Sequence, residues 1–298
     1  MCARPRRADT GLVPTDNPGM LDLRSGGLNL NRNAVPETNG VMQLLSAPVA
    51  NVVGGLGKYA MFCRETVMRS FNPRPASILI IRQMEFVGNK SLGIIVMAGA
   101  MVGAVFGLHL GNIFGMFRAE SMLGAAAGFA LSKELAPVVG AFLVTGRAGS
   151  AMAAEIATMR VNEQIDAMRV MSVNPYNYLV APRMIAAMIM MPLLAGIFIL
   201  SGISAAYFVG SLIYHVDQGI FFEKIGAMVK VRHLMEGMQK ALVFGFIFSS
   251  AGCYKGLNAG RGASGVGRAT TEAVVLALVA ILVMDFVISY LQFKMLGK

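Results

Sequence analysis

The stretch from Ser91 to Phe117 contains 27 residues and no Asp, Glu, Lys or Arg. About 20 apolar residues in a helix are enough to cross the hydrocarbon core of a bilayer. Over the whole chain, 55% of the residues are hydrophobic and 14% are charged, against roughly 25% charged in soluble domains. A soluble fold of this size would need more charge to cover its surface. The stretch therefore predicts a membrane-spanning helix in an integral membrane protein.

Four more apolar stretches predict an all-α, polytopic membrane protein with five transmembrane helices. After the first span, the others cover about 121–146, 184–214, 236–254 and 273–293. Lys240 falls near the start of the fourth span, and we expect its long side chain to reach back to the membrane surface. With the N-terminus in the cytoplasm, cytoplasmic segments hold eighteen Lys and Arg and external segments hold seven. That asymmetry predicts a cytoplasmic N-terminus and an external C-terminus.

The residues before the first span divide into a polar tail and an amphipathic segment. Residues 1–40 are rich in Pro, Gly and Asn, which predicts a flexible tail. Residues 41–90 carry apolar side chains at helical spacing with charges between them, which predicts interfacial and connecting helices. The five-span domain is expected at 91–298. Because eleven of the 26 Lys and Arg precede residue 91, the net charge of +10 indicates a cytoplasmic flank rather than nucleic-acid binding.

Five glycines recur at every fourth position of the first span. They are Gly99, Gly103, Gly107, Gly111 and Gly115. Residues four apart lie on one face of a helix, so these glycines predict a groove in which another helix can pack closely. The groove can serve packing within the chain, a dimer seam or contact with a lipid chain, and the sequence leaves these alternatives open. His109 of the same span either packs through a hydrogen bond or titrates in the physiological range.

The segment Met159–Met171 is expected on the cytoplasmic side, between the second and third spans. Apolar residues recur in it at helical spacing, and Arg160, Glu163, Asp166 and Arg169 follow at every third position. Opposite charges at this spacing pair along a helix surface, so the segment predicts a short amphipathic helix. Such a helix either docks a soluble partner or forms a solvated connection without one.

Charged side chains also occur inside the predicted spans, at Lys133, Glu134 and Asp285. An unpaired charge at the centre of a bilayer costs at least ~2.5 kcal/mol, so we expect each of them to face protein or water and to have a partner. Glu134 and Asp285 are interpreted as a gate or cavity lining, as the proton-coupling groups of a secondary carrier, or as structural pairs between helices.

Enzyme motifs are absent or lie in the wrong context. Gly260–Gly265 fits the GxGxxG pattern, but it falls in a predicted loop between two spans and not after a strand, so no dinucleotide site is expected. Gly57-Lys58 lacks the other residues of a P-loop, and the three cysteines form no pair or cluster. We therefore expect no cofactor, no metal site and no catalytic residue. A membrane-embedded lipid enzyme is the alternative, and it predicts turnover by the single purified chain.

Several runs of the sequence resemble one transporter family, in the same order along the chain. They are RQMEFVGNKSLGII at 82–95, KELAPVV at 133–139, GRAGSAMAAEIATMRVNEQIDAMRVMSVNPYNYLVAPR at 146–183 and LVMDFVISYLQF at 282–293. About residues 55–296 thus resemble the MlaE/YrbE-type permease family, the membrane subunits of ABC transporters that work with MCE proteins. The tail before Val41 is longer than usual in that family, and His109 stands where a glutamine is common.

The resemblance implies a multi-pass permease of a bacterial inner membrane that moves phospholipids or similar lipids between the inner and outer membranes. It implies that Met159–Met171 is a coupling helix for a separate ABC ATPase. The contact candidates are then Glu155, Arg160, Glu163, Asp166 and Arg169. Other implied partners are a second copy with a lipid in the shared cavity, an MCE-domain lipid-binding protein and a small STAS-like cytoplasmic subunit. The 23 methionines suit a flexible acyl chain, because methionine adapts its shape.

Overall fold

The computed structural model describes residues 54–55, 57–66, 68 and 77–296, and every regular element in this part of the chain is helical. The α-helices after residue 76 are α2 (Ser77–Val87), α3 (Asn89–Met116), α4 (Leu123–Ala130), α5 (Ala136–Val144), α6 (Ser150–Val161), α7 (Gln164–Val170), α8 (Ala181–Tyr214), α9 (Gln218–Met228), α10 (Val231–Leu257) and α11 (Gly262–Leu296). A 3-10 turn, η1 (Glu120–Met122), and three π-helical turns, η2 (Leu131–Leu135), η3 (Thr145–Gly149) and η4 (Tyr176–Val180), lie between them. The all-α prediction is confirmed for these residues, whereas the predicted tail at 1–40 lies outside them.

Four helical stretches are long and apolar enough to cross a membrane. They are Ser77–Met116, Glu120–Val161, Tyr176–Tyr214 and Gly262–Lys294. These stretches correspond to the first, second, third and fifth predicted spans. α10 takes the place of the fourth and has 27 residues, but Arg232, Glu236 and Lys240 lie near its start and lower its hydropathy. The described residues thus contain four apolar spans and one charged helix of similar length.

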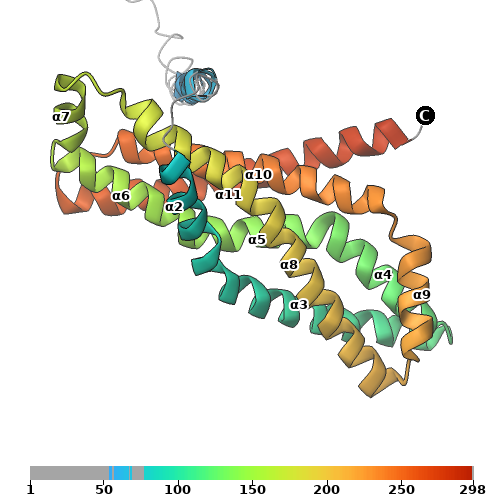
Figure 1. Ribbon diagram of the computed structural model, residues 1–298. Coiled ribbons are helices and arrows are strands. Elements are labelled where there is room, and N and C mark those ends of the chain that lie inside the picture. Colours follow the sequence, from blue (N-terminus) through green and yellow to red (C-terminus); the bar gives the residue numbers. More distant parts are fainter. Residues whose placement is uncertain (1–53, 56, 67, 69–76, 297–298) are drawn as a thin grey trace, which may run out of the picture. The chain divides into compact units, whose positions relative to one another are not determined.

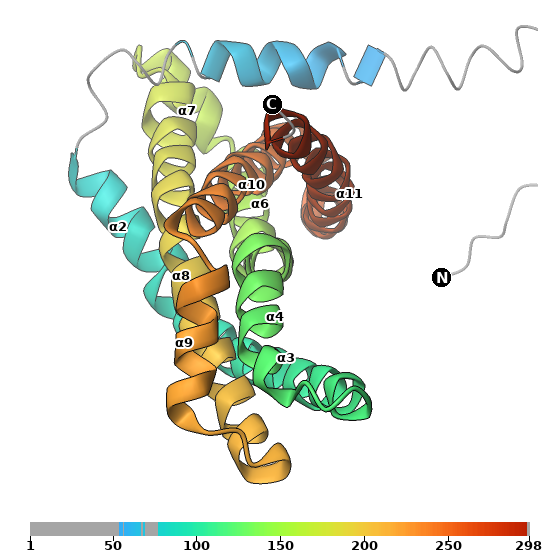
Figure 2. The same ribbon diagram turned by 90° about the vertical axis from the view of Figure 1, so that its right-hand side faces the viewer.

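The long helices run back and forth between two ends of the bundle (Figure 1). α7 and the turn between α10 and α11 lie at one end, whereas the turn between α3 and α4 and the connection from α8 to α9 lie at the other. Arg118 makes the α3–α4 turn tight by adopting a left-handed φ of 50°. α9 packs beside α4 (Figure 2). α10 therefore returns from the α9 end to the α7 end, antiparallel to α8 and α11.

The second stretch is longer than predicted. The helix continues past Gly146 to Val161 through η2 and η3, so the loop expected from residue 147 begins only at Asn162. π-helical turns inside α-helices often mark a functional site or a bend. Pro137 lies just after η2 and has no backbone N–H to donate, so the helical hydrogen-bond pattern must change near it.

Arg147, expected in a cytoplasmic loop, lies inside this long helix. Its guanidinium donates hydrogen bonds of 3.0 Å to the Phe86 carbonyl oxygen and to Ser91 Oγ. Both acceptors flank Gly88, where α2 meets α3. A Cβ on Gly88 would lie 2.9 Å from the Met84 carbonyl oxygen and would displace the end of the Met190 side chain of α8, so glycine suits the joint best. Arg147 thus fastens the joint between α2 and α3 to the second stretch.

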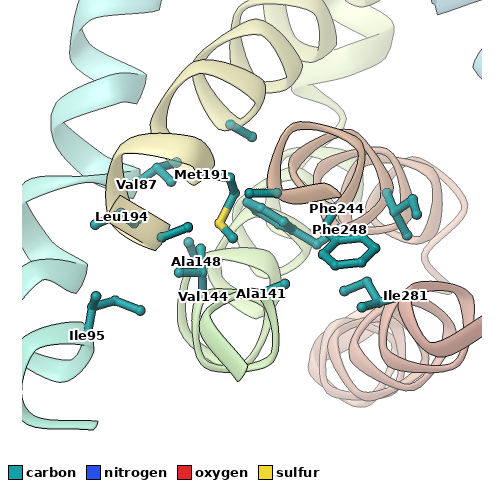
Figure 3. Packing of buried hydrophobic residues seen from close by; sticks show 14 of the residues in the cluster. Val87, Ile95, Ala141, Val144, Ala148, Met191, Leu194, Phe244, Phe248 and Ile281 are labelled. Carbon is teal, nitrogen blue, oxygen red and sulfur yellow. The ribbon is translucent and has the colours of Figure 1, made fainter. Parts of the chain in front are cut away.

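The largest apolar core lies among α3, α5, α8, α10 and α11 (Figure 3). Phe244 and Phe248, one turn apart on α10, are both fully buried in the cluster that also holds Met191 of α8. Small residues of the second stretch, such as Ala141 and Ala148, are buried in the same cluster. Lipid tails are as apolar as these side chains, so close van der Waals packing holds such helices together rather than exclusion of water.

Residues 57–66 form a helix that contacts the α7 end of the bundle. The Tyr59 hydroxyl lies 2.6 Å from Ser250 Oγ of α10. The ring of Phe62 lies with its centroid 5.8 Å from that of Tyr176 and 5.4 Å from that of Tyr254. Burial raises the pKa of the Tyr59 hydroxyl above its ordinary value. The aromatic face of the helix at 57–66 thus packs on other helices of the chain. The predicted position of this helix in the plane of the membrane surface stays a prediction.

Candidate functional site

The charged residues predicted within the spans meet at Lys240 of α10. This side chain is fully buried, and its Nζ lies 3.0 Å from Asp285 Oδ1 and 2.7 Å from Ser289 Oγ of α11. The same ammonium group contacts the Glu134 carboxylate of η2. Lys240 was predicted to reach the membrane surface, and that prediction is wrong. Two carboxylates hold its charge inside the bundle, where each charge needs an opposite partner.

A second group of charges lies one turn away on α10. Glu236 accepts a contact of 3.5 Å from Lys133 Nζ and a hydrogen bond of 3.2 Å from Arg232 Nε. The neighbours Lys133 and Glu134 therefore pair with two different residues of the same helix, Glu236 and Lys240. Each intramembrane charge has a partner, as expected, and all the partners lie on the helix that is too charged to qualify as an apolar span.

α10 approaches η2 so closely that only glycine fits between them. Gly237 lies between Glu236 and Lys240, and a Cβ on it would overlap the Ser132 carbonyl oxygen of η2. Backbone contact at this point brings the side chains on both helices within ion-pair distance. The run Glu236-Gly-Met-Gln-Lys240 carries a sequence signal for the arrangement, since it places opposite charges four residues apart around a glycine.

Four of the five glycines of α3 face α8. They are Gly99, Gly103, Gly107 and Gly111, and all four are buried. A Cβ on Gly103 would overlap the Gly202 carbonyl oxygen, and one on Gly111 would overlap the Tyr214 ring. These glycines therefore serve packing within the chain. Gly115 is only partly buried and has room for a Cβ, while His109 is exposed on another face of α3.

The predicted helix Met159–Met171 is divided in the structure. α6 ends at Val161, and α7 begins only at Gln164. Between them, Glu163 adopts a left-handed φ of 58°, which breaks the helix. Asp166 accepts hydrogen bonds of 3.1 Å from Arg160 and from Arg169. The predicted charge pairing therefore spans a corner between two helices.

One face of α7 is buried, and its end is exposed. Ile165 is fully buried in a cluster with Ile156 of α6 and Val180 of η4, which anchors α7 to α6 and η4. Beyond it, Val170 is 87% exposed and Met171 is 67% exposed. Glu163 is exposed as well. Exposed apolar side chains at one end of a short helix, with an exposed carboxylate at its other end, form a surface suited to a protein partner. The sequence pattern identified the segment but not this tip.

Glu155 has a partner within the chain. Its carboxylate accepts a hydrogen bond of 2.9 Å from Arg183 Nη2, which ties α6 to the start of α8. The Arg183 side chain is 5% exposed and that of Glu155 is 44% exposed. Among the predicted contact candidates, Glu155 therefore has a clear structural role, whereas Glu163 has its side chain on the surface.

An apolar groove of about 580 Å³ runs between the joint of α2 and α3 and the neighbouring turns of α8. Its wall includes Met84 and Leu92 on one side and Met190, Leu193 and Ile197 on the other. Both helical stretches that form it are candidate membrane spans. The flexible methionine side chains can adjust to the shape of a hydrocarbon chain. The groove is therefore a place where an acyl chain fits.

Comparison with known proteins gives matches along most of the chain. The family model for the permease MlaE matches residues 80–291. A probable ABC transporter permease protein of Rickettsia felis is 40% identical over 260 residues, which cover 83% of this chain and 98% of the relative. One from Synechocystis sp. is 38% identical over 217 residues, 73% of this chain and 82% of the relative. The chloroplastic protein TRIGALACTOSYLDIACYLGLYCEROL 1 of Arabidopsis thaliana is 35% identical over 217 residues, 73% of this chain and 62% of that protein.

Proposed function

The chain belongs to the MlaE permease family, and from this we propose that it is the membrane subunit of an ABC transporter that moves phospholipids or similar lipids between the inner and outer membranes. A separate ATPase drives the movement. The match to residues 80–291, which include the charged groups of η2, α10 and α11 and all of α7, carries the proposal. The Arabidopsis relative is named after a galactolipid, which supports a lipid ligand. The apolar groove beside α8 supports it too, because its wall suits an acyl chain.

The exposed tip of α7 is the proposed docking point of the ATPase. Val170 and Met171 supply uncovered apolar area at the end of α7, and Glu163 supplies an exposed charge at its start. Buried Ile165 holds the tip to the bundle, so a push on α7 reaches α6 directly and α8 through η4. ATP binding and hydrolysis then move these helices and change the lipid cavity.

Glu163→Lys tests this docking. The substitution reverses one exposed charge and keeps a residue with similar tolerance of the left-handed backbone, so insertion and folding are retained. We expect ATP-driven lipid transport to be lost in reconstituted vesicles. Glu223→Lys is the matched control, because Glu223 is exposed on α9 at the other end of the bundle. Normal ATP-driven transport by Glu163→Lys would refute the docking role.

We propose that α10 is a fifth span. Its 27 residues correspond to about 40 Å of helix, and its direction carries the chain back from the α9 end to the α7 end. The ion pairs of Glu236 and Lys240 with other helices supply the compensation that these charges need in a membrane. Five spans put the two termini on opposite sides, and the excess of Lys and Arg assigns the N-terminus and α7 to the cytoplasm and the C-terminus to the outside. We expect a cysteine added after Lys298 to be labelled by a reagent applied from the periplasm. A cysteine placed at position 163 should not be labelled.

The proposed complex contains a second copy of the chain, the ATPase, an MCE-domain lipid-binding protein and a small STAS-like subunit. Purification of the tagged chain in mild detergent tests this composition. We expect the ATPase and the MCE protein to co-purify with it. If neither does, the permease proposal fails.

The alternative is a proton-coupled secondary carrier that uses Glu134 and Asp285. The observation in its favour is that both carboxylates meet within the bundle at one ammonium group. A carrier of this kind transports in response to a pH gradient without ATP. Transport that needs ATP and ignores an imposed pH gradient is expected from the permease and would exclude the carrier.

A further inference from the structure

A second cavity lies far from the apolar groove, at the α7 end of the bundle. It has a volume of about 640 Å³ and lies where α10 ends and α11 begins. Its wall carries Lys255, Arg261, Arg268 and Glu272, together with the polar side chains of Asn258 and Ser264. Nothing in the proposed transport function uses this cavity.

The wall of the cavity has more positive than negative groups. Glu272 accepts hydrogen bonds of 2.8 Å from Lys255 Nζ and 2.6 Å from Arg268 Nε, so one carboxylate faces two cations. Arg261 is exposed and has no ion pair with any residue that the structure describes. With three cations and one anion, the wall has a net charge of +2. An anion in the cavity would therefore be attracted by all three basic groups.

Backbone geometry closes the cavity at the turn between α10 and α11. Gly262 has a left-handed φ of 78°, and a Cβ on Gly265 would overlap the carbonyl oxygen of Gly260. The turn is thus so tight that it needs glycine at these places. It brings the first turn of α11, with its free N–H groups, to the cavity wall. The GxGxxG spacing at 260–265 has its physical explanation in this turn.

An exposed apolar stripe on α11 begins at Val275, three residues after Glu272 of the cavity wall. From Arg268, the residues at helical spacing along one face are Val275, Val279, Leu282, Phe286, Tyr290 and Phe293, and each is more than half exposed. This stripe follows the candidate span Gly262–Lys294. A molecule with one anionic end and a long apolar body would therefore match both the cavity and the stripe, whereas a soluble anion would use only the cavity.

The geometry points to this cavity as a binding site for the phosphate group of an anionic phospholipid, with its acyl chains along the exposed face of α11. Arginine binds phosphate through parallel hydrogen bonds, which suits Arg261 and Arg268. Anionic lipids are also abundant at the cytoplasmic surface of membranes, where basic groups attract them. The site lies apart from the groove beside α8, so a lipid bound in it would act on the permease rather than be its cargo.

Lipid binding to the full-length chain in its purified transporter complex tests the site without any transport. The probes are phosphatidylglycerol and a diacylglycerol with the same acyl chains, counted by native mass spectrometry or titrated with a fluorescent lipid. We expect the wild-type chain to prefer phosphatidylglycerol. Arg261→Gln should weaken its binding about fivefold, the effect of one basic group near a membrane surface. Arg82→Gln is the matched control, since Arg82 is an exposed arginine of α2 outside the cavity.

Three outcomes decide the matter. Loss of affinity in Arg261→Gln with little change in Arg82→Gln supports the site. Equal weakening in both variants would overturn it, because general attraction between basic residues and anionic lipid would then explain the binding. Binding of inorganic phosphate at the cavity, with phosphatidylglycerol bound no better than diacylglycerol, would also overturn it and assign the cavity to a soluble phosphate. None of these results depends on ATP, so they stand whether or not the proposed transport function holds.

Discussion

Two groups of three charges in this chain have nearly the same geometry and opposite surroundings. Lys240 bridges Glu134 and Asp285, with 3.0 Å to the latter, and its side chain is fully buried. Asp166 bridges Arg160 and Arg169 at 3.1 Å each, with its own side chain 52% exposed. The contacts look alike, and Glu134 is 42% exposed, but the Lys240 ammonium at the centre of the first group cannot reach water, whereas all three side chains of the second group can. Burial rather than distance therefore decides how much each group matters to folding.

The largest effect is expected from Lys240→Met. The substitution leaves the carboxylates of Asp285, which is 23% exposed, and Glu134, which is 42% exposed, without their cation, so we expect the lower end of the cost of breaking a buried ion pair, ~3 kcal/mol. Denaturant unfolding of the purified chain in detergent measures the change. The control is the triple variant that combines Lys240→Met with Glu134→Gln and Asp285→Asn. It removes the uncompensated charges and should recover much of the lost stability. If Lys240→Met alone were as stable as the wild type, the ion pairs of Lys240 would have no structural role.

Glu236→Gln tests an intermediate case. The Glu236 side chain is 9% exposed, while those of its partners Lys133 and Arg232 are 20% and 58% exposed. Arg232 can turn to solvent when the carboxylate is lost, and Lys133 cannot do so as easily. We expect a loss of about 1–3 kcal/mol in the same unfolding experiment. Glu223→Gln, which removes an exposed carboxylate of α9, should change stability by much less.

Asp166→Asn should have the smallest effect on stability. All three side chains of its group are more than a third exposed, so each can bind water instead. We expect a loss of at most ~1 kcal/mol, and less at high salt, where exposed charges are screened. Unfolding at two salt concentrations measures this. A loss as large as that of Lys240→Met would show that the cluster around Asp166 stabilises the fold and would remove the contrast.

The spans without internal charge were predictable from the sequence. The first and third predicted spans agree with α3 and α8 to within a few residues, because a long uncharged run has few alternatives to a membrane helix. The glycine spacing also predicted close packing correctly, although only the structure identified α8 as the partner. Periodicity fixes which face packs, but it carries no information about which helix lies opposite.

The end of the second helix was predicted too early because its charges looked like those of a loop. Arg147 donates hydrogen bonds to two oxygen atoms at the α2–α3 joint, and Glu155 pairs with Arg183. The partners of both residues are distant in sequence. Lys240 was misplaced for the same reason. The break at Asn162 had a local signal, since asparagine is common where helices end, but the charge pattern at every third residue favoured one continuous helix.

ATP-dependent transfer of a phospholipid by the reconstituted complex tests the proposed function most directly. Vesicles would contain the chain with its co-purified ATPase and MCE partner, and a fluorescent phospholipid would report transfer to acceptor vesicles. Transfer that requires ATP hydrolysis, continues without a pH gradient and stops in Glu163→Lys is the predicted result. Transfer at the same rate without ATP, or driven by a pH gradient alone, would contradict a permease that works through a separate ATPase.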